Sequence, residues 1–161
     1  MASWSPSQYG TFLDWRTRPA RDLAQRINIA ATRGKIIDLG CGPGNSTAVC
    51  AEHWPAASIV GLDSSPEMIA AARAAQPDRC WIVGDIGEWA LQPLEPENRV
   101  DLIFSSAALQ WIDDHATVFP RLIEKLSPGG VLAAQMPAYD AIPNRTMREI
   151  ASRPMESKME L

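Results

Sequence analysis

One stretch near the start of the sequence constrains the fold more than any other. An apolar run over residues 35–39 contains Asp38, and three glycines, Gly40, Gly42 and Gly44, follow it at every second position. A short β-branched run before a glycine-rich turn is typical of a buried strand that ends abruptly. Glycines let the main chain turn sharply and leave no Cβ between the backbone and a ligand. The stretch therefore predicts a strand that leads into a backbone cradle.

A helix is predicted directly after the glycines, over residues 48–54, with Asn45, Ser46 and Thr47 available to cap it. The free N–H groups at such a helix start face the cradle and whatever it holds. A dinucleotide-binding fingerprint would have glycine where this chain has Asn45. The carboxylate of Asp38 also suits a positively charged ligand better than a pyrophosphate. Both differences weigh against a nicotinamide cofactor.

The pattern Asp38-x-Gly40-x-Gly42-x-Gly44 resembles the first motif of class I methyltransferases, which use S-adenosylmethionine. Flanking runs narrow the resemblance to the trans-aconitate 2-methyltransferase family, from about residue 4 to about residue 148. Those runs are Trp4-x-Pro6-x-x-Tyr9-x-x-Phe12, Arg16-x-Arg18-Pro19-Ala20, Gly42-Pro43-Gly44-Asn45-Ser46-Thr47, Asp63-Ser64-Ser65-Pro66-x-Met68-Ile69, Leu109-Gln110-Trp111 and Gln135-Met136-Pro137.

Alternating strand and helix patterns predict an α/β fold with a doubly wound, mostly parallel, Rossmann-like sheet. The remaining strands are expected at 58–62, 80–83, 100–104 and 131–136. The resemblance implies seven strands, of which this sequence supplies about five. The same resemblance divides the chain into three parts: an N-terminal helical cap segment (1–34), a Rossmann-like core expected to bind S-adenosylmethionine (35–137) and a truncated C-terminal tail (138–161).

Local signals predict several details of the elements and loops. Pro19 suits the first turn of a helix, and Ser65 followed by proline caps another. Asp113 or Asp114 can cap a third helix, residues 90–99 form a linker, and residues 127–130 form a turn. The last strand is expected to have an exposed apolar edge and one uncovered face, because the resembled fold places later elements there. We therefore expect a fragment or shortened gene product that self-associates and is inactive alone.

Candidate binding residues follow the ends of the predicted strands. Asp63 lies about twenty positions past the glycine turn, the distance at which a carboxylate accepts bonds from a ribose. It could instead cap the next helix, although Ser65 already supplies a cap. Asp85 could be a turn residue, whereas the resemblance makes it an adenine contact.

The resemblance implies a set of residues around the bound cofactor and its substrate. For S-adenosylmethionine the set is Asp38, Gly40, Cys41, Gly42, Gly44, Asn45, Asp63, Ser64, Met68, Asp85, Ile86 and Ser105. Tyr9, Gln110 and Trp111 are expected to border the substrate. No catalytic acid or base and no metal site is predicted.

Composition excludes several other function classes. The 161 residues carry a formal net charge of −4, so no basic surface favours nucleic acid as a partner. Three cysteines are too few and too scattered for a disulfide framework or a zinc site, and as free thiols they favour a reducing cytoplasm. Neither a signal peptide nor an apolar run long enough to span a membrane is predicted.

The function implied by the resemblance is methyl esterification of a small polycarboxylic acid such as trans-aconitate. A carboxylate substrate is already ionised at neutral pH, so direct in-line transfer from the sulfonium requires no general base. Two alternatives are an inactive S-adenosylmethionine-binding fragment or partner subunit and, less favoured, a nicotinamide-dependent oxidoreductase.

Overall fold

Five parallel strands form one sheet in the computed structural model, which describes residues 13–29, 34–93 and 95–137. The strand order is β3-β2-β1-β4-β5, and every neighbouring pair is parallel. The strands are β1 (Lys35–Leu39), β2 (Ser58–Asp63), β3 (Cys80–Val83), β4 (Val100–Ser106) and β5 (Leu126–Gln135). The predicted doubly wound α/β class is confirmed.

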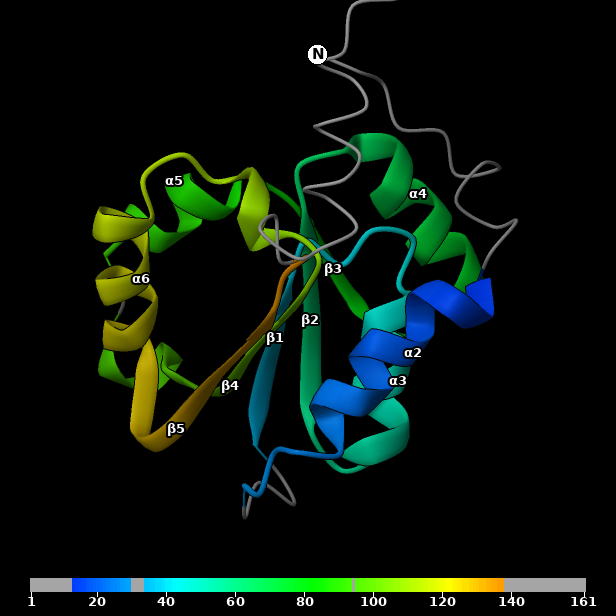
Figure 1. Cartoon of the computed structure of the whole chain (residues 1–161), viewed down its shortest axis with the longest axis horizontal. Coiled ribbons are helices and arrows are strands. Elements are labelled where there is room, and N and C mark those ends of the chain that lie inside the picture. The colour runs from blue at the N-terminus through cyan, green and yellow to red at the C-terminus, as the bar shows by residue number, and fades with distance from the viewer. Residues whose placement is uncertain (1–12, 30–33, 94, 138–161) are drawn as a thin grey trace, which may run out of the picture.

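Helices cover both faces of this sheet (Figure 1). On one side lie α2, α3 and α4, and on the other lie α5 and α6. Their bounds are Leu13–Ala24 for α2, Asn45–His53 for α3, Pro66–Ala75 for α4, Ile86–Leu91 for α5 and His115–Glu124 for α6. Two short 3-10 helices, η1 (Pro96–Asn98) and η2 (Leu109–Trp111), complete the described elements. No helix in the described ranges has the length and apolar character needed to cross a membrane.

Alternate residues of the central strands supply two hydrophobic clusters, one on each face. Ile36 of β1 and Phe104 of β4 are buried with Val49 of α3. Ile37 and the neighbouring Ile103 of β4 belong to the opposite cluster. Because successive strand side chains point to opposite faces, a strand covered on both sides needs a continuous apolar run. This is why residues 35–39 give such a clear sequence signal.

Three details of the predicted elements are wrong. Pro19 lies inside α2 and not in its first turn. Helix α3 begins at Asn45 with Gly44 as its N-cap, so no side chain caps it. The predicted turn at 127–130 falls within β5, where Gly129 has a φ of +80° and the register with β4 is irregular.

Both faces of β5 are partly covered, and Ala133 is its only buried residue. Val131 and Ala133 pack with the cluster that contains α2 residues. Leu132 and Ala134 pack with the cluster that contains α6 residues. The backbone edge is different, since among the described strands β5 pairs only with β4. Residues 138–161, the predicted tail, lie outside the described residues.

Candidate functional site

The glycine turn forms a left-handed loop at the carboxyl end of β1. Gly40, Gly42 and Gly44 have φ values of +70°, +55° and +95°, which L side chains rarely adopt. A Cβ on Gly40 would lie 2.1 Å from Ala108 Cβ, and one on Gly44 would lie 2.8 Å from the Trp81 ring. A Cβ on Gly42 would meet no atom within 4 Å. Gly42 therefore faces open space, whereas the other two glycines permit close packing.

Asp38 holds the first turn of α3 from beneath the loop. Its Oδ2 accepts hydrogen bonds from Ser46 Oγ and Thr47 Oγ1, both at 2.6 Å. The side chain is fully buried, and burial raises the pKa of Asp38 to about 6, with a further increase from the charge of Asp63. The two hydrogen bonds oppose that rise. The hydroxyls predicted as helix caps thus serve to orient a buried carboxylate.

Asp63, at the carboxyl end of β2, binds the glycine loop with one oxygen. Its Oδ2 accepts a 2.8 Å hydrogen bond from the Gly42 N–H, and its Oδ1 accepts a 2.9 Å bond from the Ser65 N–H. Ser65 caps α4 as predicted, since its Oγ accepts from the Met68 N–H. Asp63 is therefore not the side-chain cap of α4. No sequence pattern indicates the bond to Gly42, which joins residues 21 positions apart.

The other predicted cofactor contacts differ in their exposure. Asp85 is exposed and caps α5 through a 3.0 Å bond from the Glu88 N–H. Met68 and Ile86 are buried, and Ser64 is exposed.

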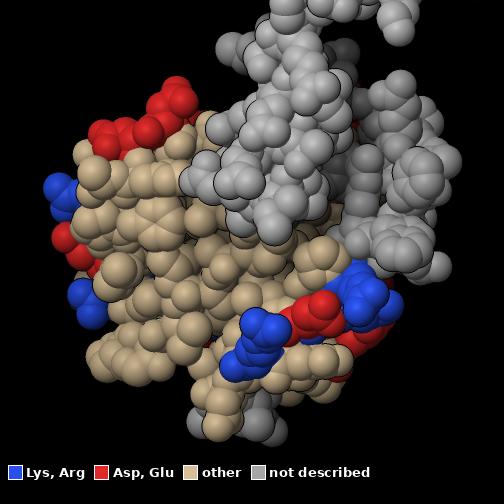
Figure 2. All heavy atoms as spheres, viewed as in Figure 1, with Lys and Arg blue, Asp and Glu red and all other residues tan. Residues whose placement is uncertain are grey.

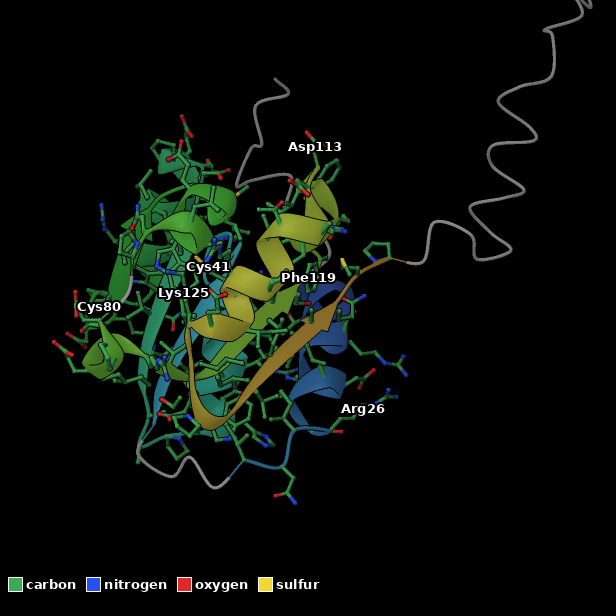
Figure 3. The ribbon with its side chains drawn as sticks, turned by 90° about the vertical axis from the view of Figure 1, so that its left-hand side faces the viewer. Arg26, Cys41, Cys80, Asp113, Phe119 and Lys125 are labelled. Carbon is green, nitrogen blue, oxygen red and sulfur yellow. The ribbon has the colours of Figure 1, made fainter. Side chains whose placement is uncertain are left out.

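Two predicted contacts have their side chains directed into the protein. Ser105 is fully buried, and its hydroxyl donates to the Leu39 carbonyl oxygen at 2.9 Å. This bond joins the ends of β4 and β1. Burial also raises the pKa of the Cys41 thiol, which makes it a poor nucleophile at neutral pH. Cys41, labelled in Figure 3, lies two residues after the end of β1.

The loop after β4 lies against the glycine loop through the contact between Ala108 and Gly40. Ala107 has a φ of +57°, an uncommon conformation for a residue with a side chain. Gln110 Nε2 donates to the Ala107 carbonyl oxygen at 2.8 Å, and Trp111 is 66% exposed. Tyr9, the third predicted substrate contact, lies outside the described residues. The position of Ala107 after a predicted strand places it at the site, but no sequence pattern indicates its positive φ.

Unpartnered polar atoms gather at this end of the sheet. Within the described ranges, the buried side-chain atoms without a hydrogen-bond partner are Asp38 Oδ1, Asn45 Nδ2 and Gln110 Oε1. Asp38 lies near the end of β1, Asn45 begins α3, and Gln110 lies in η2 after β4. Burying such groups without partners is costly, so they favour a polar ligand here.

The charges of the site favour a cationic ligand. Asp38, Asp63 and Asp85 lie at or just after the ends of three strands, and the loops at 40–44, 63–65, 84–85 and 106–111 contain no Lys or Arg. A sulfonium or ammonium group would be attracted here, and a pyrophosphate would be repelled. Together with the open space above Gly42, this charge pattern fits S-adenosylmethionine. Among the described residues, no group of three or more His, Cys, Asp or Glu is placed to hold a metal ion.

A family model described as a methyltransferase domain matches residues 36–130. The chain belongs to this methyltransferase family. It is 51% identical over 152 residues to trans-aconitate 2-methyltransferase from Azoarcus sp., a match that covers 92% of this chain and 57% of that protein. The enzyme of the same name from Methylobacterium radiotolerans is 49% identical over 153 residues, covering 94% and 56%.

Solved structures of methyltransferases share the fold. The S-adenosylmethionine-dependent methyltransferase from Mesorhizobium loti superposes with a TM-score of 0.61 at 34% identity, over 77% of this chain and 55% of that one. The predicted resemblance and the family's cofactor, S-adenosylmethionine, are thus confirmed. The chain spans about half the length of the curated relatives it matches.

Proposed function

We propose that the protein transfers a methyl group from S-adenosylmethionine to a carboxylate of a small polycarboxylic acid such as trans-aconitate. The observation that supports the cofactor site most strongly is the open space at Gly42, in the loop that follows the buried Asp38 and binds the half-buried Asp63. The 51% identity to a trans-aconitate 2-methyltransferase supports the choice of substrate class.

Each part of the cofactor has a matching group in the proposed site. The loop backbone from Gly40 to Gly44, with Asp38, holds the methionyl end, where a cationic ammonium offsets the buried negative charge. Asp63 accepts hydrogen bonds from the ribose hydroxyls. Met68 and Ile86 supply apolar contacts for the adenine, and Asp85 accepts from its amino group.

The methyl transfer requires the side chains to position the reactants and does not require them to act as an acid or a base. When bound, the cofactor supplies an electrophilic methyl group on a sulfonium. A carboxylate nucleophile is ionised at neutral pH, so no residue has to remove a proton. The residues contribute by holding the reactants in line, for which Gln110 and Trp111 border the substrate.

The free cysteines and the acidic charge also indicate the compartment and the partners of the protein. All three cysteines, Cys41, Cys50 and Cys80, are free, which supports a reducing compartment such as the cytoplasm. The acidic net charge and the acidic strand ends support a small molecule, and not nucleic acid, as the partner.

Turnover tests the proposal directly. In contrast to the sequence-based expectation of a chain that is inactive alone, we expect transfer of label from methyl-labelled S-adenosylmethionine to trans-aconitate, giving a base-labile methyl ester. Binding of S-adenosylmethionine without any transfer would instead favour an inactive binding domain or partner subunit. Hydride transfer from NADH with no binding of S-adenosylmethionine would favour the oxidoreductase.

A further inference from the structure

Three successive backbone N–H groups attach the glycine loop to the end of β2. The N–H groups of Gly40 and Cys41 both donate to the Leu62 carbonyl oxygen, at 2.8 and 3.1 Å. The third N–H, that of Gly42, donates to Asp63 Oδ2 at 2.8 Å. The first two bonds need only a backbone carbonyl, which any residue at position 62 would supply. The third depends on the side chain at position 63.

We propose that Asp63 is a positioning residue for the glycine loop, in addition to the ribose contact on which this inference rests. The bond fixes Gly42, the glycine that faces open space, before any ligand binds. Removing it frees the part of the loop that would touch the methionyl end. Asp63 therefore affects parts of the cofactor that its own carboxylate does not reach.

The two roles of Asp63 are compatible. A carboxylate offers about four lone-pair sites on two oxygens, and the structure uses one site on each oxygen for the N–H groups of Gly42 and Ser65. Each oxygen retains a site for a ribose hydroxyl. Ligand binding therefore does not require release of the loop.

The isosteric amide separates these roles because it has only one acceptor atom. In Asp63→Asn, the amide oxygen can keep the local bond from the Ser65 N–H, a two-residue turn that asparagine supports well. The amide nitrogen then faces the Gly42 N–H, donor against donor. The variant keeps the turn and loses the bond to the loop.

Hydrogen exchange in the ligand-free protein tests the loop bond. We expect the Gly42 amide to exchange roughly tenfold faster or more in Asp63→Asn, as the loss of one charge-assisted bond implies. Asp114→Asn is the matched control, because Asp114 caps α6 through the Thr117 N–H and lies outside the site. In the Asp114→Asn variant, the Gly42 amide should exchange at the same rate as in the parent. Equal Gly42 exchange in the parent and in Asp63→Asn would overturn the proposal.

A ligand without the ribose hydroxyls tests whether Asp63 affects cofactor binding through the position of the loop. S-adenosylhomocysteine and its 2′,3′-dideoxy analogue are titrated into the parent and into Asp63→Asn. If Asp63 also positions the loop, the substitution weakens the dideoxy analogue by about tenfold. Equal affinity of both proteins for the analogue would show that Asp63 acts through the hydroxyls alone, which contradicts the proposal. If the parent binds neither ligand, the proposed function fails, and the exchange measurement alone decides the loop role.

Discussion

Among single residues, two glycines have similar backbone conformations, but only one of them lies at the proposed cofactor site. Gly42 and Gly129 both have positive φ values, +55° and +80°, and a Cβ on either would meet no atom within 4 Å. Valine at either position should cost roughly 1–3 kcal/mol of unfolding free energy through backbone strain. Only Gly42→Val would place a side chain where the cofactor is proposed to bind.

We therefore expect Gly42→Val to abolish binding of S-adenosylhomocysteine, while Gly129→Val binds it like the parent. Thermal melting should show similar losses of stability for both variants, which makes Gly129→Val the control for strain. Titration calorimetry measures the affinities. Unaltered affinity in Gly42→Val would exclude the loop as the binding site.

The buried carboxylate of Asp38 should make stability depend on pH. Its pKa rises from 3.8 to about 6 on folding, mainly through burial. A raised pKa contributes stability that is present below pH 4 and lost as the pH rises through about 6, and this shift corresponds to about 3 kcal/mol. Asp38→Asn has no such titration.

The free energy of unfolding of the parent, minus that of Asp38→Asn, should thus decrease by up to about 3 kcal/mol between pH 4 and pH 7. Urea unfolding at a series of pH values measures it, and other carboxylates cancel in the difference. Parallel curves for the two proteins would contradict a raised pKa at Asp38.

At the scale of elements, Lys125 connects the end of α6 to α5. The side chain is 3% exposed, its Nζ donates to the Gln92 carbonyl oxygen at 2.8 Å, and Nζ lies 4.7 Å from the centre of the Trp89 ring. Desolvation lowers the pKa of Lys125. Figure 3 shows Lys125 at the end of α6 that leads into β5.

Lys125→Ala should lower the free energy of unfolding by about 2 kcal/mol, because both the packed alkyl stem and the hydrogen bond are lost. Lys125→Met keeps most of the stem and should cost about half as much. Urea denaturation measures both values. Equal stability of the parent and both variants would show that the contact contributes nothing.

Elements that depend on local sequence were predictable. Strands buried on both faces appear as apolar runs, and the caps at Ser65 and Asp114 come from side chains three residues before their partners. The sequence pattern does not reveal α5, because the helix is short and its N-cap, Asp85, also suits a ligand contact or a turn. Pro19 was misplaced because the first-turn preference of proline does not exclude an interior position in a structure.

Contacts between distant residues were not predictable from pattern. The bonds from Ser46 and Thr47 to Asp38, and from Gly42 to Asp63, join different elements. They depend on how β1, β2 and α3 are placed in three dimensions. Sequence spacing identified Asp38 and Asp63 as site residues. It could not show that each carboxylate accepts hydrogen bonds from other residues of the protein in the absence of a ligand.

At the scale of the whole molecule, β5 is an edge strand in the described part of the chain. Residues 126–135 contain no charged residue, and Figure 2 shows an uncharged area between the charged side chains at the left and those at the lower right. Natural edge strands usually carry charges or are covered. The faces of β5 are partly covered, and the backbone groups at its edge, which pair with no other described strand, are the basis for association.

We therefore expect reversible self-association through β5, with the average mass in solution rising with protein concentration. Light scattering coupled to size-exclusion chromatography measures that mass. A monomer mass at all concentrations would contradict this prediction and would leave the fold and the cofactor site unaffected.

Binding of S-adenosylmethionine by a loop flanked by carboxylates is the basis of the proposed function. Calorimetric titration of the protein with S-adenosylmethionine, and separately with NADH, tests this binding. The charge of the site predicts one-to-one binding of S-adenosylmethionine and no detectable binding of NADH, whose pyrophosphate Asp38 and Asp63 would repel. Binding of NADH with no binding of S-adenosylmethionine would contradict the proposed function.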